Sequence, residues 1–218
     1  MIKVFLKSNN LLVLCFIFST TLIMAKSSEI SFQNKIIPDQ IFDEANAALS
    51  HYPSLENTPI EFKIKSSLHK SFMKAQPKFG TLLNPIENRA YKILISSTFS
   101  LENKTLALKD IPKDVLIGWL GHELGHIMDY KERSALNLCW FGIKYYFSGN
   151  HIRKAERIAD SYAVSHNMKD YIIATKNYIL NHADLSDKYK ERIKRLYVSP
   201  DEILKIVEEQ EASKAITN

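Results

Sequence analysis

The segment from Val115 to Ile127 constrains the fold most, because it combines a helical apolar pattern with two histidines four positions apart. Positions four apart lie on the same face of a helix. His122 and His126 can therefore reach one metal ion, with Glu123 beside them. Chance would produce this His-Glu-x-x-His pattern in about one chain in 70 of this composition. The pattern predicts a helix that carries part of a metal site.

A third ligand is expected further along the chain, because a catalytic zinc site needs three protein ligands and an open position for water. Glu156 and Asp160 are four apart in a second helical segment. We expect Glu156 to bind Zn²⁺ and Asp160 to accept a hydrogen bond from the outer nitrogen of a ligand histidine. Glu123 would take a proton from the water. The alternative is a solvated helix face, on which the two carboxylates pair with Arg153 and Arg157.

Small residues predict how these two helices pack. The first helix carries glycines at i, i+3 and i+7, and each costs about 1 kcal/mol relative to alanine inside a helix. These are Gly118, Gly121 and Gly125. The second helix carries alanines four positions apart, namely Ala155, Ala159 and Ala163. We expect the narrow side of the second helix to lie against the glycines.

Periodicity and turn residues predict an α+β fold. A small mixed sheet would pack on the helix of the histidine pair and on the helix of Glu156, with a mostly helical C-terminal half. The expected strands are 60–66 and 91–95, with a loop at 76–88. The expected helices are 38–49, 110–133, 138–147, 151–167, 169–182, 186–197 and 200–214. Asp110 or Ile111 would cap the second of these helices, and Gly149 with Asn150 would precede the helix that carries Glu156.

The N-terminus has a basic start followed by an apolar run from Leu11 to Ala25. These features predict a secretory signal peptide at 1–25. The alternative is an uncleaved membrane anchor, although a spanning helix usually needs about 20 apolar residues. Residues 26–218 would then form one domain, with its core at about 85–200. We expect an exported protein that is periplasmic or extracellular.

Charge and cysteine content narrow the classes of partner. Loss of Lys3 and Lys7 with the signal peptide lowers the formal net charge from +5 to +3, which is too small to indicate nucleic acid. Cys139 is then the only cysteine, and its apolar neighbours predict a buried thiol. The surrounding segment 138–147 is too short to cross a bilayer. We expect a core helix there, and contact with a membrane surface is the alternative.

The two motifs together resemble those of known metallopeptidases. His122-Glu123-Leu124-Gly125-His126, followed by Glu156-Arg157-Ile158-Ala159-Asp160-x-x-Ala163, is similar to the gluzincins. The similarity is closest to the HtpX-like and CAAX-prenyl-protease-type peptidases, including their soluble periplasmic members, and covers about residues 85–200. The metzincin-type extension is absent, because Asp129 and Glu132 occupy its Gly and His positions.

A C-terminal element of these relatives is matched only in part. They often carry His-Pro-x-x-x-x-Arg-Ile, whereas this chain has Ser186 and Asp187 in place of His-Pro and retains Arg192-Ile193. The resemblance therefore implies that Arg192 stabilises the transition state, with a surface arginine as the alternative. An oxyanion donor is also expected among several residues, between which the sequence does not choose. They are Tyr145, Tyr146, His151, Tyr162, His166, His182 and Arg192.

The resemblance implies a zincin-like endopeptidase with one Zn²⁺ per chain and a protein or peptide substrate. The strand near 91–95 is similar to the edge strand on which such enzymes align an extended peptide. Two other functions remain open. One is a zinc-binding chaperone or quality-control factor of the cell envelope with little proteolytic activity. The other is a latent enzyme whose C-terminal helices, rich in Lys and Glu from Lys188 to Lys214, block the cleft. The sequence does not predict the oligomeric state.

Overall fold

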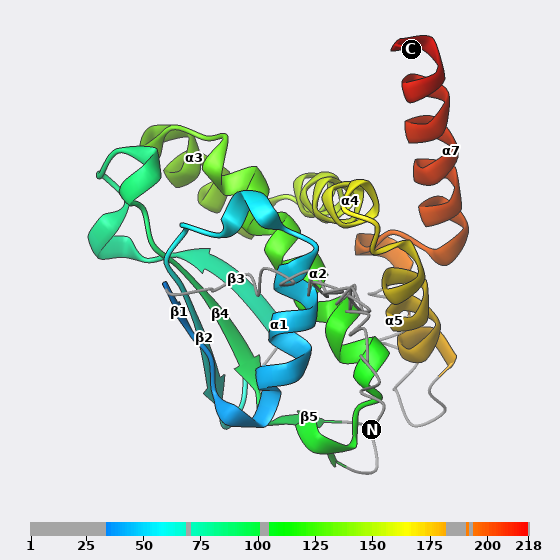
Figure 1. Cartoon of the computed structure of the whole chain (residues 1–218), viewed down its shortest axis with the longest axis horizontal. Helices are drawn as coiled ribbons and strands as arrows, with labels where there is room; N and C mark the ends of the chain where they lie inside the picture. The colour runs from blue at the N-terminus through cyan, green and yellow to red at the C-terminus, as the bar shows by residue number, and fades with distance from the viewer. Residues whose placement is uncertain (1–33, 69–70, 101–104, 182–190, 192–193, 218) are drawn as a thin grey trace, which may run out of the picture.

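The computed structural model describes residues 34–68, 71–100, 105–181, 191 and 194–217. These residues form an α+β fold, in which a small mixed sheet packs against helices (Figure 1). The fold class and the mixed sheet are thus as expected. The predicted signal peptide at 1–25, His182 and Arg192 lie outside the described residues.

The main sheet has four strands in the order β1-β2-β4-β3. They are β1 (Lys35–Ile36), β2 (Ile60–Lys65), β3 (Met73–Pro77) and β4 (Tyr91–Ser96). β1, β2 and β4 are parallel, and β3 runs antiparallel to β4. Apolar residues alternate along β2 and β4 and are buried on the helical side, as a sheet with one covered face requires. A second ladder pairs β5 (Thr98–Ser100) with β6 (Thr105–Ala107).

The predicted strands at 60–66 and 91–95 are confirmed, but the role of the second as an edge strand is wrong. β4 lies between β2 and β3, and Tyr91, Ile93 and Ile95 are fully buried. The strand at the edge beside β4 is β3, which overlaps the start of the predicted loop at 76–88. Its sequence, MKAQP, is poor in β-branched and aromatic residues, so pairing with β4 rather than local propensity makes it a strand.

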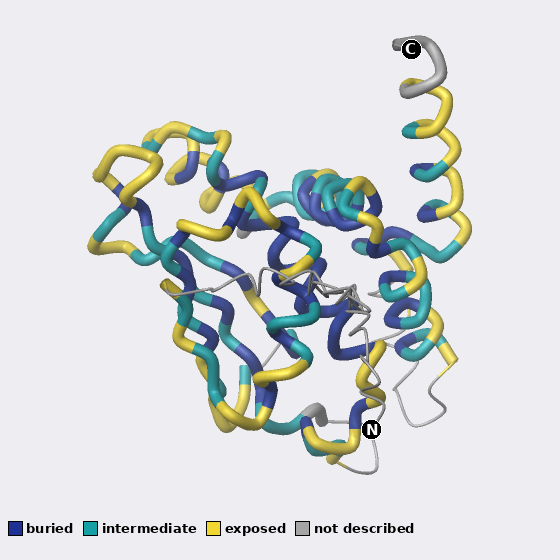
Figure 2. Tube along the Cα trace, in the orientation of Figure 1, coloured by how far each residue is buried: buried dark blue, intermediate teal, exposed yellow. Residues whose placement is uncertain are grey.

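Helix α2 is the centre of the fold. The helices are α1 (Phe42–Ser50), α2 (Lys113–Lys131), α3 (Ala135–Phe147), α4 (Gly149–Ser165), α5 (Lys169–Asn181) and α7 (Pro200–Thr217). α2 contacts β3, α1, α4 and α5, and every residue from Val115 to Ile127 is buried (Figure 2). It is therefore a helix buried on all sides rather than one with a single apolar face. No helix among the described residues is long and apolar enough to span a membrane.

Several helix boundaries differ from those expected, and α1 begins at Phe42 because Asp39–Ile41 forms a separate 3₁₀ turn. α2 begins after Pro112, since Leu108–Asp110 forms a separate 3₁₀ turn. α4 begins at Gly149, two residues earlier than expected, because the Ser148 hydroxyl accepts a hydrogen bond from the His151 amide and caps the helix there. Of the helix predicted at 186–197, most lies outside the described residues, and Lys194–Leu196 is helical.

The turn between α4 and α5 has a local cause in the sequence. Asn167 adopts a left-handed conformation with φ of 61°, which asparagine tolerates better than most residues. The amides of Asn167 and Met168 donate to the carbonyls of Val164 and Ala163, the pattern of a Schellman C-cap. The turn directs the fully buried Met168 side chain onto Gly121 of α2.

The glycines of α2 let three neighbours approach, but only Gly125 meets α4 as expected. A Cβ on Gly125 would overlap the backbone of Ala159, one of the alanines of α4. A Cβ on Gly118 would overlap the backbone carbonyl of Tyr171 on α5. Close packing of α2 on α4 and α5 therefore depends on the missing side chains.

We expect Gly118→Ala to destabilise the protein. The new methyl group meets a backbone atom that cannot rotate away, and such overpacking costs about 1–3 kcal/mol. Thermal unfolding should show a melting temperature lower by roughly 2–10 °C. Gly142→Ala on α3 is the matched control, because a Cβ there meets nothing within 4 Å. It should leave stability unchanged or raise it, and equal destabilisation by both variants would contradict the packing argument.

Helix α3 differs from the buried core helix predicted at 138–147. Leu138 and Phe141 are buried, but Trp140 is 56% exposed. Cys139 is exposed as well, so the prediction of a buried thiol is wrong. The segment is apolar on both sides, and only one side can face the core.

Candidate metal centre

Two helices bring three candidate ligands together. His122 and His126 lie on α2, and Glu156 lies on α4, which crosses α2 at the Gly125–Ala159 contact. One ligand atom from each lies within 4.8 Å of the others, and all three residues are buried. The Nε2 atoms of His122 and His126 lie 2.9 and 3.6 Å from Glu156 Oε2. The group could hold a metal ion.

Asp160 orients the first histidine, as the spacing predicts. His122 Nδ1 donates to Asp160 Oδ1 at 2.7 Å, so His122 Nε2 faces Glu156. This arrangement fixes the tautomer of a ligand histidine. The other oxygen of Asp160 lies 2.9 Å from the ammonium group of Lys176, on α5. Asp160 is fully buried and Lys176 nearly so. The alternative pairing with Arg153 and Arg157 is not seen.

Instead, both arginines of α4 turn toward the C-terminal helix. Arg153 pairs with Glu202, and Arg157 pairs with Glu209 at 2.8 Å. α7 therefore packs on α4 and α5 and then extends away from the rest of the molecule (Figure 1). The carboxylates of Glu156 and Asp160 are left to the histidines.

The charges at this site favour a cation. With neutral histidines, Glu123, Glu156 and Asp160 contribute three negative charges, which Lys176 balances only in part. Burying two excess negative charges is costly unless they are paired. A divalent cation among the three ligand atoms would make the total neutral. The donor set of two imidazoles and one carboxylate therefore fits a divalent metal.

Without a metal, the buried histidines and carboxylates of this site shift one another's pKa values. Burial alone lowers the pKa of His122, but the carboxylates of Asp160 and Glu156 raise it to about 10. Burial raises the pKa of Glu156, but His126 and His122 hold it well below its ordinary value. Burial likewise opposes ionisation of Asp160, and Lys176 and His122 lower its pKa. A metal at this site must displace a proton from His122, so its uptake should release protons.

Glu123 lies beside the candidate ligands and contacts the edge strand. Its Oε2 accepts a hydrogen bond from the Ala75 amide of β3 at 2.5 Å. The Tyr130 hydroxyl lies 3.4 Å from the Ala75 carbonyl oxygen. Both backbone groups of Ala75 therefore point away from β4 and toward α2. Burial raises the pKa of Glu123, although the nearby histidines oppose the effect. A raised pKa brings a carboxylate closer to the range of a general base at neutral pH.

Of the candidate oxyanion donors, the structure places Tyr145 at the centre. Its hydroxyl donates to Glu156 Oε1 at 2.7 Å. Tyr162 bonds Glu132 instead, and His166 bonds the Tyr162 carbonyl and stacks on Tyr52. His151 packs its ring against Phe141. Nothing is described for the Tyr146 side chain, His182 or Arg192, so the role expected for Arg192 stays a prediction.

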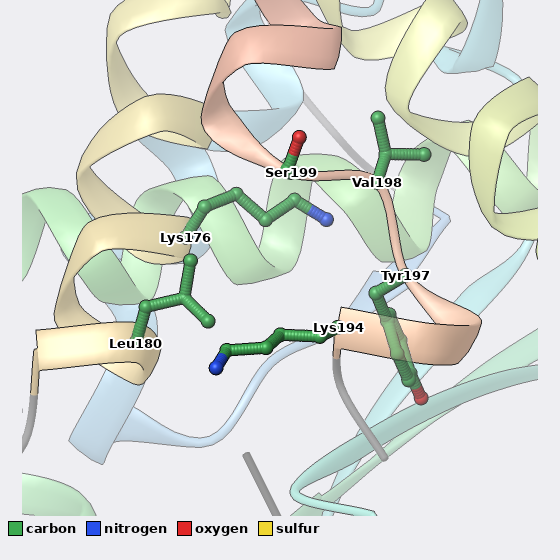
Figure 3. Close-up of a pocket in the computed structure, with 6 residues that line it drawn as sticks. All are labelled: Lys176, Leu180, Lys194, Tyr197, Val198 and Ser199. Carbon is green, nitrogen blue, oxygen red and sulfur yellow. The ribbon is translucent and has the colours of Figure 1, made fainter. Parts of the chain in front are cut away.

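Two residues of the site escaped the sequence prediction. Ala75 lies in the missed strand β3. Lys176 occupies the apolar face of α5 between Ile172 and Ile179, and a lysine at a buried helical position was the available signal. Its aliphatic chain also lines a small cavity with Tyr197 (Figure 3), and its ammonium group lies 5.8 Å from that ring.

Comparison of the chain with known protein families, curated proteins and solved structures found no match.

Proposed function

We propose that this protein is a zinc-dependent endopeptidase of the gluzincin type, which acts outside the cytoplasm. The observation that carries the proposal is the convergence of His122, His126 and Glu156 on one point with Glu123 beside them. Two imidazoles and one carboxylate are a common donor set of catalytic zinc, and one such ion per chain is expected. A pure metal store would have no need of a buried base at position 123.

In this mechanism, bound zinc would polarise the scissile carbonyl and acidify a water molecule. Glu123 takes the proton of that water and later delivers it to the leaving amine. Asp160 holds His122 in the tautomer that presents Nε2 to the metal. The hydroxyl of Tyr145 already reaches Glu156, and it is the described group best placed to donate a hydrogen bond to an oxyanion.

The substrate would bind as an extended peptide along β3. This strand is at an edge of the sheet, and the amide and carbonyl of Ala75 point toward Glu123 rather than toward β4. An added strand could pair with these groups once Glu123 releases the amide. The strand that would align the peptide is therefore residues 73–77, in place of the expected residues 91–95.

Metal removal tests this function. The purified protein should contain one zinc per chain and hydrolyse casein or a peptide library. Chelation should remove both the zinc and the activity, and Zn²⁺ but not Mg²⁺ should restore them, because the imidazole ligands do not suit Mg²⁺. Metal analysis and a protease assay on the same samples provide the measurement. Stoichiometric zinc without hydrolysis of any substrate would favour the zinc-binding chaperone. Absence of zinc would exclude both the zinc endopeptidase and the zinc-binding chaperone.

A further inference from the structure

Helix α3 has two apolar faces, of which only one faces the core. The inner face contains Leu138, Phe141 and Tyr145. The outer face contains Leu136, Trp140 and Ile143, which are 82%, 56% and 50% exposed. At 100° per residue these three lie within about 60° of one another. A helix that is apolar all round is normally buried, so an exposed stripe of this kind indicates a surface that contacts something else.

A nearby loop adds more exposed apolar side chains. In the loop 78–90 between β3 and β4, Phe79 and Leu83 are 86% and 87% exposed. The guanidinium group of Arg89 donates to the Arg133 carbonyl oxygen at 2.7 Å, which fixes the end of this loop against the turn before α3. The loop and α3 accordingly protrude from the same end of the molecule (Figures 1 and 2). We call Phe79, Leu83, Leu136, Trp140 and Ile143 the docking face.

The first strand, β1, begins at this same end of the molecule. Strand register places Lys35 opposite Ile60, Ile60 opposite Tyr91, and Tyr91 opposite Pro77. Pro77 directly precedes the loop of the docking face, and Asn34 is the first described residue. Neighbouring strands are about 4.8 Å apart, so the start of β1 lies roughly 15 Å from the end of β3.

Positive charge accompanies the docking face. No Asp or Glu occurs between Glu132 and Glu156, a stretch that contains Lys144 and Lys154. The Lys144 ammonium group lies 5.2 Å from the centre of the Trp140 ring. Both lysines line an open pocket at the junction of α3 and α4. Apolar side chains with a tryptophan and adjacent lysines are typical of a helix that lies in the interface of an anionic membrane.

We propose that the docking face binds the surface of a lipid bilayer that carries anionic headgroups. Trp140 and its apolar neighbours would enter the headgroup region, and Lys144 and Lys154 would contact lipid phosphates. A second copy of the chain is a less suitable occupant, because it does not explain the lysines. Tyr145 lies on the inner face of α3 and contacts Glu156, so the candidate metal centre would lie directly behind the membrane surface.

The two tryptophans of the chain provide a direct test, since Trp119 is buried in α2 and Trp140 lies on the docking face. The protein is recovered from cells that express the full chain and is mixed with vesicles of brominated phosphatidylcholine, with or without phosphatidylglycerol. We expect quenching of Trp140 fluorescence that is stronger with phosphatidylglycerol and absent in Trp140→Phe. In the double variant Leu136→Ser with Ile143→Ser, half-maximal quenching should need roughly tenfold more lipid or higher, given the apolar area lost.

Leu204→Ser is the matched control, because Leu204 is 47% exposed on α7, outside the docking face. It should leave the quenching curve unchanged, and circular dichroism should show that all variants fold. Unquenched Trp140 on every vesicle would overturn the proposal, as would equal curves for the double variant and the control. Loss of Trp140 exposure through self-association, detected by sedimentation without lipid, would assign the face to a second copy instead. These results do not depend on peptide hydrolysis, so they are separate from the test of the proposed function.

Discussion

Replacing Glu123 by Gln should lower peptide hydrolysis about 10²–10⁴-fold while the zinc content stays at one per chain. Glutamine has the shape of glutamate but cannot take a proton from water at neutral pH. Its side-chain oxygen can still accept the hydrogen bond from the Ala75 amide, so the contact between α2 and β3 is kept. Initial rates on a fluorogenic peptide and metal analysis of the same preparation provide the measurement.

Glu132→Gln is the matched control for this variant. Glu132 directly follows α2, is exposed, and accepts a hydrogen bond from Tyr162. Its replacement makes the same chemical change outside the candidate site and should leave the rate within a few-fold of the original. If Glu123→Gln retained comparable activity, the proposed mechanism would be wrong even with zinc bound.

The second large effect is expected for Glu156→Ala, which should lose most of its zinc. The variant removes one of three ligand atoms and leaves the Tyr145 hydroxyl without its acceptor. Loss of an outer partner of a ligand typically lowers metal affinity about 10–100-fold, and we expect loss of a direct ligand to exceed this. Competition with a zinc-binding dye gives the affinity, and circular dichroism of the metal-free form shows whether the helices persist.

A graded comparison makes this prediction specific. Asp160→Asn keeps all three ligands but weakens the orientation of His122 and the ion pair with Lys176, so its zinc affinity should lie between those of the original protein and Glu156→Ala. Glu208→Ala removes an exposed carboxylate from α7 and should bind zinc normally. Unchanged zinc affinity in Glu156→Ala would exclude Glu156 as a ligand.

The core of the candidate site was predictable because it depends on short-range spacing. Two histidines four apart share one helix face in any tertiary context, and the same holds for Glu156 with Asp160. The glycines and alanines also indicated that the two helices touch, since small residues allow close approach of backbones. The structure places His122 within hydrogen-bonding distance of both Glu156 and Asp160.

Other features required information that local patterns do not contain. β3 is a strand because β4 lies beside it, and its own sequence predicts a loop. Lys176 belongs to the site because α5 packs on α2 and α4, which places its ammonium group on Asp160. The side of α3 that faces outward could not be predicted either, because both of its sides are apolar.

By itself, then, the sequence determined the α+β class, the helix of the histidine pair and the identity of the candidate ligands, all of which follow from helical periodicity and residue chemistry. Tertiary structure alone decided which strand borders the candidate centre, which lysine neutralises Asp160 and which apolar face of α3 is exposed. The physical reason is that these features depend on contacts between segments far apart in the chain, and burial and charge pairing in such contacts override local propensity.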